Sequence, residues 1–186
     1  TSTLSGVYAN DLQHLKSDPD ASYERVIEYN AANFKPVVAC PSNVDNIKDV
    51  EELIGTTIDQ GFIGSCTNGR LEDLEIAAHI LKGRKIALYK KLIVTPASKS
   101  IYAEAAKKGI IGILVEAGAI VNPPGCGLCC GRSGGIVSDG ERVIATNNRN
   151  FLGRMGGPKS EIFLASPATV AAAVVEGKIV DPTKYL

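Results

Sequence analysis

The chain has 186 residues, and 45% of them are hydrophobic, which is enough for a domain with a sizeable core. Its 20 basic and 20 acidic side chains cancel, which argues against nucleic acid or an anionic membrane surface as a partner. Five cysteines are too few for a secreted disulfide scaffold, and we identify no signal peptide or membrane span, so we expect a reducing, cytoplasmic environment.

Residues 1–57 form the first of two expected regions. Turn-forming residues are frequent there, as in "SDPD" and "CPSNVDN", and only residues 21–30 have a weak regular pattern. We therefore expect an N-terminal arm or a partial layer, packed on an α/β domain formed by residues 58–186.

Strand-like and helix-like segments alternate from residue 58 onward. Strands are predicted over 58–64, 90–96, 119–124, 142–147 and 161–166, and helices over 70–85, 98–109, 112–118 and 167–178. This alternation is typical of a three-layer α/β/α domain, in which helices cover both faces of a mostly parallel sheet. Functional groups in such domains gather at the carboxyl ends of the strands, so we expect the loops that follow the strands to converge.

Two of these loops contain thiols. Cys66 lies in "GSCTNGR", and Cys126 and Cys129 have a C-x-x-C spacing in "PPGCGLCCGR". Glycines beside the thiols permit positive φ and expose backbone N–H groups toward sulfur. Three such cysteines suit an iron–sulfur cubane in which one iron has no protein ligand and acts as a Lewis acid.

Two other uses of the thiols remain open on spacing alone. A structural zinc site would need a fourth ligand, and the only histidines are His14 and His79, of which His79 lies in a predicted helix. A thiol redox protein would use Cys126 with Cys129 and would not need Cys66. Cys130 is ambiguous as a ligand, because adjacent cysteines rarely reach the same metal, and Cys40 is expected to be structural.

The third loop, "TNNRNFLGR", concentrates amide and guanidinium groups. Arg149 and Arg154 can each offer a bidentate fork to a carboxylate, and Asn148 can hydrogen-bond a hydroxyl or carboxylate group. A solvated loop with two surface arginines is the alternative interpretation. The position of the loop after a predicted strand favours a site for a di- or tricarboxylate.

The motifs "GSCTNGRLEDL", "PPGCGLCCGRSGG" and "TNNRNFLGRMGGP" together resemble the aconitase superfamily, and within it the large subunits of the isopropylmalate isomerase and homoaconitase type. The resemblance covers nearly all of the chain. It implies the family's iron–sulfur domain, with Cys66, Cys126 and Cys129 as ligands of a [4Fe–4S] cluster. It also implies that Asn148, Arg149 and Arg154 bind the substrate.

The implied activity is that of a hydro-lyase, which isomerises a 2-hydroxy di- or tricarboxylate by dehydration and rehydration. The implied partners are the remaining large-subunit domains and a small subunit that carries a swivelling domain. We find no counterpart of the family's catalytic base or of its earlier-domain His, Asp and Glu residues. The chain therefore resembles the third domain of a large subunit, and we expect no turnover from it alone. Cys130 departs from the family pattern, since relatives usually carry an apolar residue there.

Overall fold

The computed structural model describes residues 17–186, and the chain divides by packing into two units, residues 1–34 and 35–186. In the described part of the first unit, a single 3-10 turn, η2 (Ala31–Asn33), interrupts an extended exposed segment. The Asn30 side chain caps this turn by accepting a hydrogen bond from the Ala32 N–H group.

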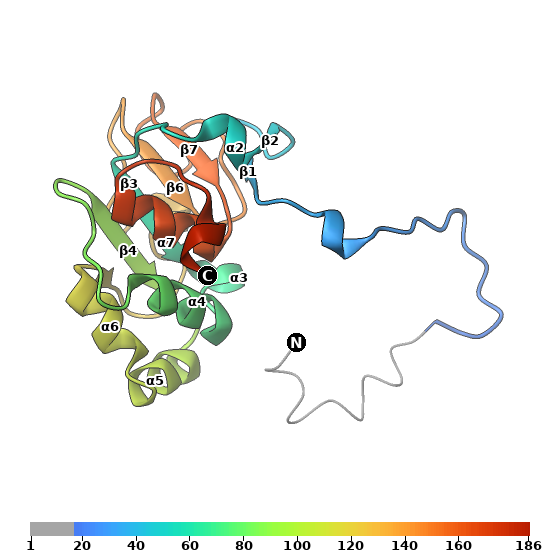
Figure 1. Ribbon diagram of the computed structural model, residues 1–186, viewed down its shortest axis with the longest axis horizontal. Helices are drawn as coiled ribbons and strands as arrows, with labels where there is room; N and C mark the ends of the chain where they lie inside the picture. The colour runs from blue at the N-terminus through green and yellow to red at the C-terminus, as the bar shows by residue number, and fades with distance from the viewer. Residues whose placement is uncertain (1–16) are drawn as a thin grey trace. The chain divides into compact units, whose positions relative to one another are not determined.

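The second unit is built on a seven-stranded sheet with the order β2-β1-β7-β6-β3-β4-β5 (Figure 1). The strands are β1 (Val37–Ala39), β2 (Ile47–Asp49), β3 (Gln60–Gly64), β4 (Lys91–Thr95), β5 (Ile120–Val121), β6 (Arg142–Ala145) and β7 (Glu161–Leu164). Strands β3 to β7 pair in parallel, whereas β1 is antiparallel to both β2 and β7. The predicted α/β fold with a mostly parallel sheet is confirmed.

The antiparallel edge comes from residues that precede the predicted α/β region. Strands β1 and β2 add to the sheet beside β7, and a short helix, α2 (Val50–Leu53), follows β2. Val38 and Val50 are buried, and both belong to the larger hydrophobic core of the unit. Part of the predicted arm therefore extends the sheet.

The longer helices begin and end at residues that suit helix termini. They are α4 (Leu71–Leu81), α5 (Lys99–Lys107), α6 (Ile110–Ala117) and α7 (Pro167–Glu176). Ser98 and Ser166 cap α5 and α7 by accepting hydrogen bonds from backbone N–H groups three residues later, as their residue types favour. Gly177 ends α7 in the left-handed conformation. None of the helices within residues 17–186 is long and apolar enough to cross a membrane.

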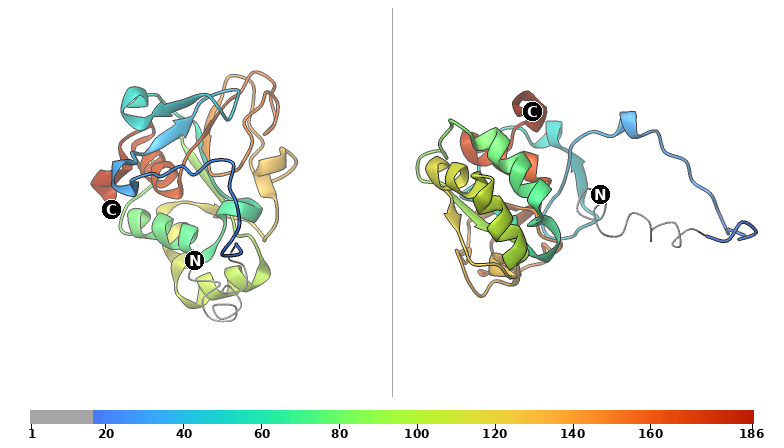
Figure 2. Two further views of the ribbon diagram at one scale, coloured as in Figure 1. Left: turned by 90° about the vertical axis from the view of Figure 1, so that its right-hand side faces the viewer. Right: turned by 90° about the horizontal axis from the view of Figure 1, so that it is seen from below.

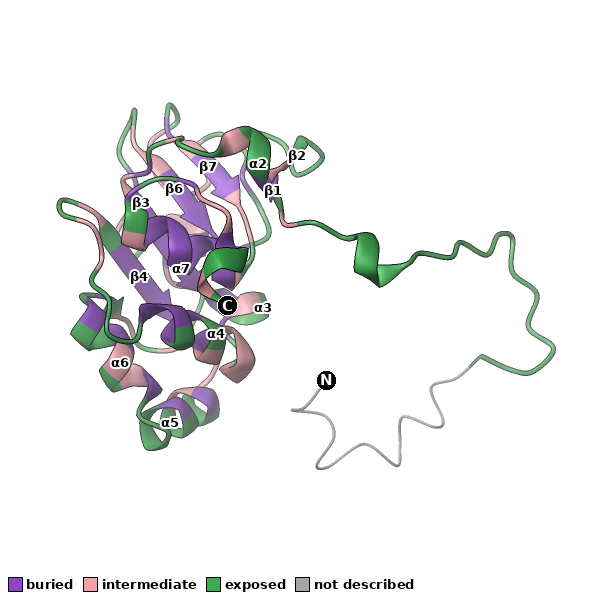
Figure 3. Cartoon of the chain, viewed as in Figure 1, coloured by how far each residue is buried: buried purple, intermediate pink, exposed green. Residues whose placement is uncertain are grey.

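The two faces of the sheet are covered differently. The longer helices pack on one face, where they share the larger core with Ile63, Leu92 and Ile144 of the strands. Figure 2 shows α4, α5 and α6 stacked against one another, and Figure 3 shows the buried residues concentrated in the sheet and in α7.

The opposite face carries a smaller core that loops cover. Phe62 and Ile93 of the strands contact Leu128, Val137 and Met155 there. Helices were expected on both faces, but the covering segments are rich in glycine, proline and asparagine. These residues disfavour helix, and within the described residues only one 3-10 turn, η3 (Gly127–Cys130), forms on this face.

Candidate functional site

Three loops converge at the carboxyl ends of the parallel strands, as predicted. The first cysteine loop, residues 65–69, follows β3 and contains the short helix α3 (Ser65–Asn68). The second cysteine loop, residues 122–135, follows β5 and contains η3, which packs against α3. The arginine loop, residues 146–156, follows β6.

Hydrogen bonds join these loops. The Thr67 hydroxyl donates to Asn148 Oδ1 at 3.0 Å, and Asn68 Nδ2 donates to the Thr146 carbonyl at 2.6 Å. Arg154 Nε donates to the Cys129 carbonyl oxygen at 2.6 Å. The arginine loop is therefore bonded to both cysteine loops, although the bonded residues lie far apart in the sequence.

Thr95, the last residue of β4, supports both cysteine loops. A methyl group added at Gly64 or Gly69 would lie only 2.2 or 2.7 Å from the Thr95 carbonyl oxygen. A methyl group added at Gly127, next to Cys126, would lie 2.4 Å from Thr95 Oγ1. Because real side chains do not approach so closely, the two loops can lie this near to β4 only with glycine at these positions.

The thiols of the two cysteine loops are free and differ in exposure. Cys66 and Cys126 are exposed, Cys130 is partly buried, and Cys129 is buried in the smaller core. A cleft of about 420 Å³, lined by residues 122–127, Cys130 and residues 133–134, gives access to the second loop. The site therefore offers thiols at the surface and one thiol held in a packed environment.

Cys40 lies outside this cluster of thiols. It is buried in the larger core, and this burial raises the pKa of its thiol above the ordinary value, while Lys48 acts in the opposite direction. Its carbonyl oxygen accepts a hydrogen bond of 2.8 Å from Asn150 Nδ2. These contacts are those of a packing residue, in line with the structural role expected for Cys40.

A single metal ion and an iron–sulfur cluster need different arrangements of donors. Tetrahedral zinc, with Zn–S bonds of about 2.3 Å, holds its sulfur ligands within about 4 Å of one another. Across residues 17–186, no group of three or more His, Cys, Asp or Glu side chains is placed to hold a metal ion. His79 is exposed, as expected for a surface residue, and His14 lies outside the described residues.

An iron–sulfur cluster spreads its ligands over several irons, so its thiolates lie further apart than those of one zinc ion. The two adjacent glycine-containing turns carry free thiols, the ligand type of such clusters. Two buried hydroxyl groups beside these turns, Ser65 Oγ and Thr95 Oγ1, have no hydrogen-bond partner among the described residues. The free thiols of Cys66, Cys126 and Cys129 are of the donor type that an iron–sulfur cluster needs.

The two arginines of the third loop have different surroundings. Arg149 is exposed, and its Nη1 group donates to the Asn148 carbonyl at 2.9 Å. Arg154 is partly buried, stacks 5.5 Å from the Phe151 ring centre, and places Nη2 3.7 Å from Cys129 Sγ. Arg149 can therefore meet a ligand directly, whereas Arg154 also braces the turn that carries Cys129.

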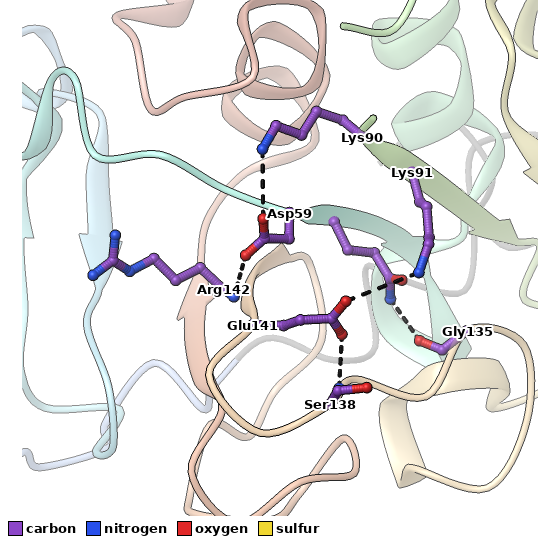
Figure 4. Close-up of polar contacts among 8 residues, drawn as sticks. Asp59, Lys90, Lys91, Gly135, Ser138, Glu141 and Arg142 are labelled. Carbon is purple, nitrogen blue, oxygen red and sulfur yellow. Dashed lines mark hydrogen bonds and ion pairs between the residues drawn. The ribbon is translucent and has the colours of Figure 1, made fainter. Parts of the chain in front are cut away.

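A network of ion pairs and hydrogen bonds lies at the amino ends of the parallel strands, opposite the three loops (Figure 4). Asp59 accepts a hydrogen bond of 2.9 Å from the Arg142 N–H group and lies 3.4 Å from Lys90 Nζ. Gln60 Nε2 donates to the Gly135 carbonyl at 2.6 Å, which ties the end of the second cysteine loop to β3. This network therefore holds the amino ends of the strands together and fixes the end of the second cysteine loop.

Sequence reasoning missed Thr95 and Thr146, the two buried threonines beside the end of β3. Thr146 Oγ1 accepts a hydrogen bond of 3.0 Å from the Gly64 N–H group. The available signal was a polar residue at the carboxyl end of an otherwise apolar strand, where ligands of parallel sheets bind.

Comparison with known proteins identifies relatives across most of the chain. Residues 43–177 match the family model described as "Aconitase family (aconitate hydratase)". The chain is 53% identical over 176 residues to 3-isopropylmalate dehydratase large subunit 2 of Archaeoglobus fulgidus, covering 95% of this chain and 42% of that protein. It is 53% identical over 178 residues to large subunit 1 of the Thermotoga maritima enzyme, covering 95% of this chain and 43% of that protein. The chain thus spans about two fifths of the length of these relatives.

Proposed function

The chain belongs to the aconitase family, and we propose that it is the cluster-bearing part of a hydro-lyase large subunit, with Cys66, Cys126 and Cys129 holding a [4Fe–4S] cluster. The enzyme isomerises a 2-hydroxy di- or tricarboxylic acid of the isopropylmalate or homocitrate type. The observation that carries the proposal is the convergence of two loops with free thiols and one loop with arginines at the same edge of the sheet. Relatives named as 3-isopropylmalate dehydratase large subunits support the reaction class.

The cluster, when bound, supplies an iron without a protein ligand that polarises the C–O bond of the substrate hydroxyl group. The residues of the chain bind and orient the substrate around it. Arg149 offers an exposed guanidinium fork for a substrate carboxylate. Asn148 is held by Thr67 through its Oδ1 atom, so its Nδ2 group is the end that meets the substrate.

Arg154 has a positioning role in addition to binding substrate. Its Nε group holds the Cys129 carbonyl oxygen, and its Nη2 group lies near Cys129 Sγ. The Nη2 group can donate a hydrogen bond to this sulfur, which is one of the proposed iron ligands. The remaining N–H groups of the guanidinium stay available for a carboxylate.

Proton transfer is assigned to parts of the enzyme beyond this chain. Residues 65–69, 122–135 and 146–156 include no His, Asp, Glu, Lys or Tyr, so apart from the cysteines the three loops contain none of the usual general bases. The base and the rest of the substrate shell come from other large-subunit domains and from a small subunit. The chain alone therefore binds a cluster without turning over substrate.

Anaerobic reconstitution with iron and sulfide tests the proposal. Broad visible absorption and bound iron are expected for the wild-type chain and for the Cys40→Ala and Cys130→Ala variants. Both are lost when Cys66, Cys126 or Cys129 is replaced by alanine. Tight zinc binding without iron, or a reversible dithiol titration that is independent of Cys66, would contradict the cluster. Substrate dehydration by the reconstituted chain alone would contradict the assignment of the base to other domains.

A further inference from the structure

The hydroxyl group of Thr95 is buried and unpartnered. Thr95 is fully buried at the end of β4, and its Oγ1 atom has no hydrogen-bond partner among residues 17–186. A buried polar group without a partner destabilises the folded state, and native proteins keep few of them. A valine in this place would have the same shape without the unmatched group. Because this hydroxyl does not stabilise the folded chain, we expect it to have another function.

The position of Thr95 indicates where this role lies. The Oγ1 atom lies against Gly127, the first residue of η3, which follows Cys126. The carbonyl oxygen of Thr95 lies against Gly64 and Gly69, on either side of Cys66. Thr95 therefore lies between the two turns that carry the exposed thiols, and its hydroxyl faces the second of them.

Ser65 is a second buried hydroxyl of the same kind. Its Oγ atom is also buried without a partner among the described residues, and it immediately precedes Cys66. Its φ of +72° is a left-handed conformation that residues other than glycine rarely adopt. Two unmatched hydroxyl groups and an unfavourable backbone conformation thus occur together beside the thiols.

Thr146 is a natural comparison for Thr95. It is buried beside the end of β3 on the opposite side, next to β6. Its hydroxyl accepts a hydrogen bond of 3.0 Å from the Gly64 N–H group and lies 3.5 Å from the Gly64 carbonyl oxygen. Both threonines contact the chain just before Cys66, but in the described part of the chain only the Thr146 hydroxyl has a hydrogen-bond partner.

We propose that Thr95 is a positioning residue whose hydroxyl donates a hydrogen bond to sulfur of the bound cluster or of its thiolate ligands. This inference rests on the proposed function, because it requires a cluster between the two cysteine loops. Hydrogen bonds to the sulfurs are among the factors that set the reduction potential of a cluster, and groups surrounding the ligands affect how tightly metal is held.

The first test uses the chain without a cluster and measures thermal unfolding of Thr95→Val, Thr95→Ser and Thr146→Val. Thr95→Val is expected to melt at the wild-type temperature or above it, because it removes an unmatched polar group. Thr146→Val is expected to melt lower, because it leaves the Gly64 N–H group without its partner. Equal destabilisation by Thr95→Val and Thr146→Val would overturn the inference, since the Thr95 hydroxyl would then have a partner in the fold.

The second test uses the reconstituted chain and measures iron release to a chelator and the reduction potential. Thr95→Val is expected to release iron about 10-fold faster, the lower end of the effect typical of residues that surround metal ligands. Its potential is expected to be more negative, and Thr95→Ser, which keeps the hydroxyl, is expected to restore both values. An unchanged release rate and potential in Thr95→Val would overturn the role of Thr95 alone. Failure of the wild-type chain to take up iron would overturn the proposed function as well.

Discussion

Replacing Gly127 with alanine is expected to destabilise the chain through two separable effects. Gly127 has a φ of +53°, and an alanine in this left-handed conformation costs about 1–2 kcal/mol. The added methyl group would also lie 2.4 Å from Thr95 Oγ1 and 3.0 Å from Thr95 Cβ. Overpacking of this kind costs about 1–3 kcal/mol, so the total is about 2–5 kcal/mol.

Gly83→Ala is the matched control for this prediction. Gly83 has a φ of +73°, but no atom lies within 4 Å of a methyl group added there. Only the backbone effect of about 1–2 kcal/mol is therefore expected. Urea unfolding of the cluster-free chain measures both variants, and the difference between their free energies of unfolding isolates the contact with Thr95.

A double-mutant cycle links the excess destabilisation to Thr95. Thr95→Ala removes the Oγ1 and Cγ2 atoms that the new methyl group would meet, so Gly127→Ala should cost less in that background. Coupling energies between contacting residues are about 0.5–3 kcal/mol. Equal free energies of unfolding for Gly127→Ala and Gly83→Ala, with no coupling to Thr95, would refute the argument that β4 fixes the second cysteine loop.

Three further predictions address other parts of the chain. Gly112→Ala should stabilise it by about 0.5–1 kcal/mol in urea unfolding, because Gly112 lies within α6 with open space around it. Burial raises the pKa of the Cys40 thiol above 9.0, so the folded chain binds more protons than the unfolded chain as pH rises past this value. The free energy of unfolding should therefore fall with pH in that window, and Cys40→Ala should show a smaller fall. Arg154→Lys should cost about 1 kcal/mol in thermal unfolding through loss of the bond to Cys129, whereas Arg149→Lys at the surface should cost less than about 0.5 kcal/mol.

The core strands and longer helices were predictable from local patterns. Apolar runs such as those around Phe62 and Ile93 mark strands that are buried on both faces. Ser98 and Ser166 at helix starts and Gly177 at a helix end mark termini that depend only on nearby backbone groups. Convergence of the three loops followed from the parallel arrangement, because carboxyl ends of parallel strands meet at one edge of the sheet.

The antiparallel edge was not predictable in the same way. Strands β1 and β2 have three residues each, and two of the three residues of β2 are charged. Such short segments have no periodicity that distinguishes a strand from a turn. They pair with each other locally, but β1 joins the rest of the sheet through β7, whose first residue lies more than a hundred positions later in the chain.

The side-chain contacts of the site were also beyond local patterns. The carboxylate-binding interpretation of Arg154 follows from its residue type, whereas its bond to Cys129 depends on how the second cysteine loop and the arginine loop meet. The role of Thr95 depends on glycines that precede and follow it by about thirty residues. Contacts of this range become visible only once the strand order is known.

The strand order explains why the two sides of β3 can have different roles. Strand β3 lies between β6 and β4, so Cys66, just beyond its end, has a buried threonine on either side. Thr146 bonds to the backbone of Gly64 and fixes the β6 side, which carries the arginine loop. On the β4 side, where the second cysteine loop approaches, the Thr95 hydroxyl has no hydrogen-bond partner within residues 17–186. A fold that fixes one side of the first thiol and leaves a hydroxyl without a partner among the described residues on the other is suited to donate a hydrogen bond to a sulfur-containing group held by the two cysteine loops.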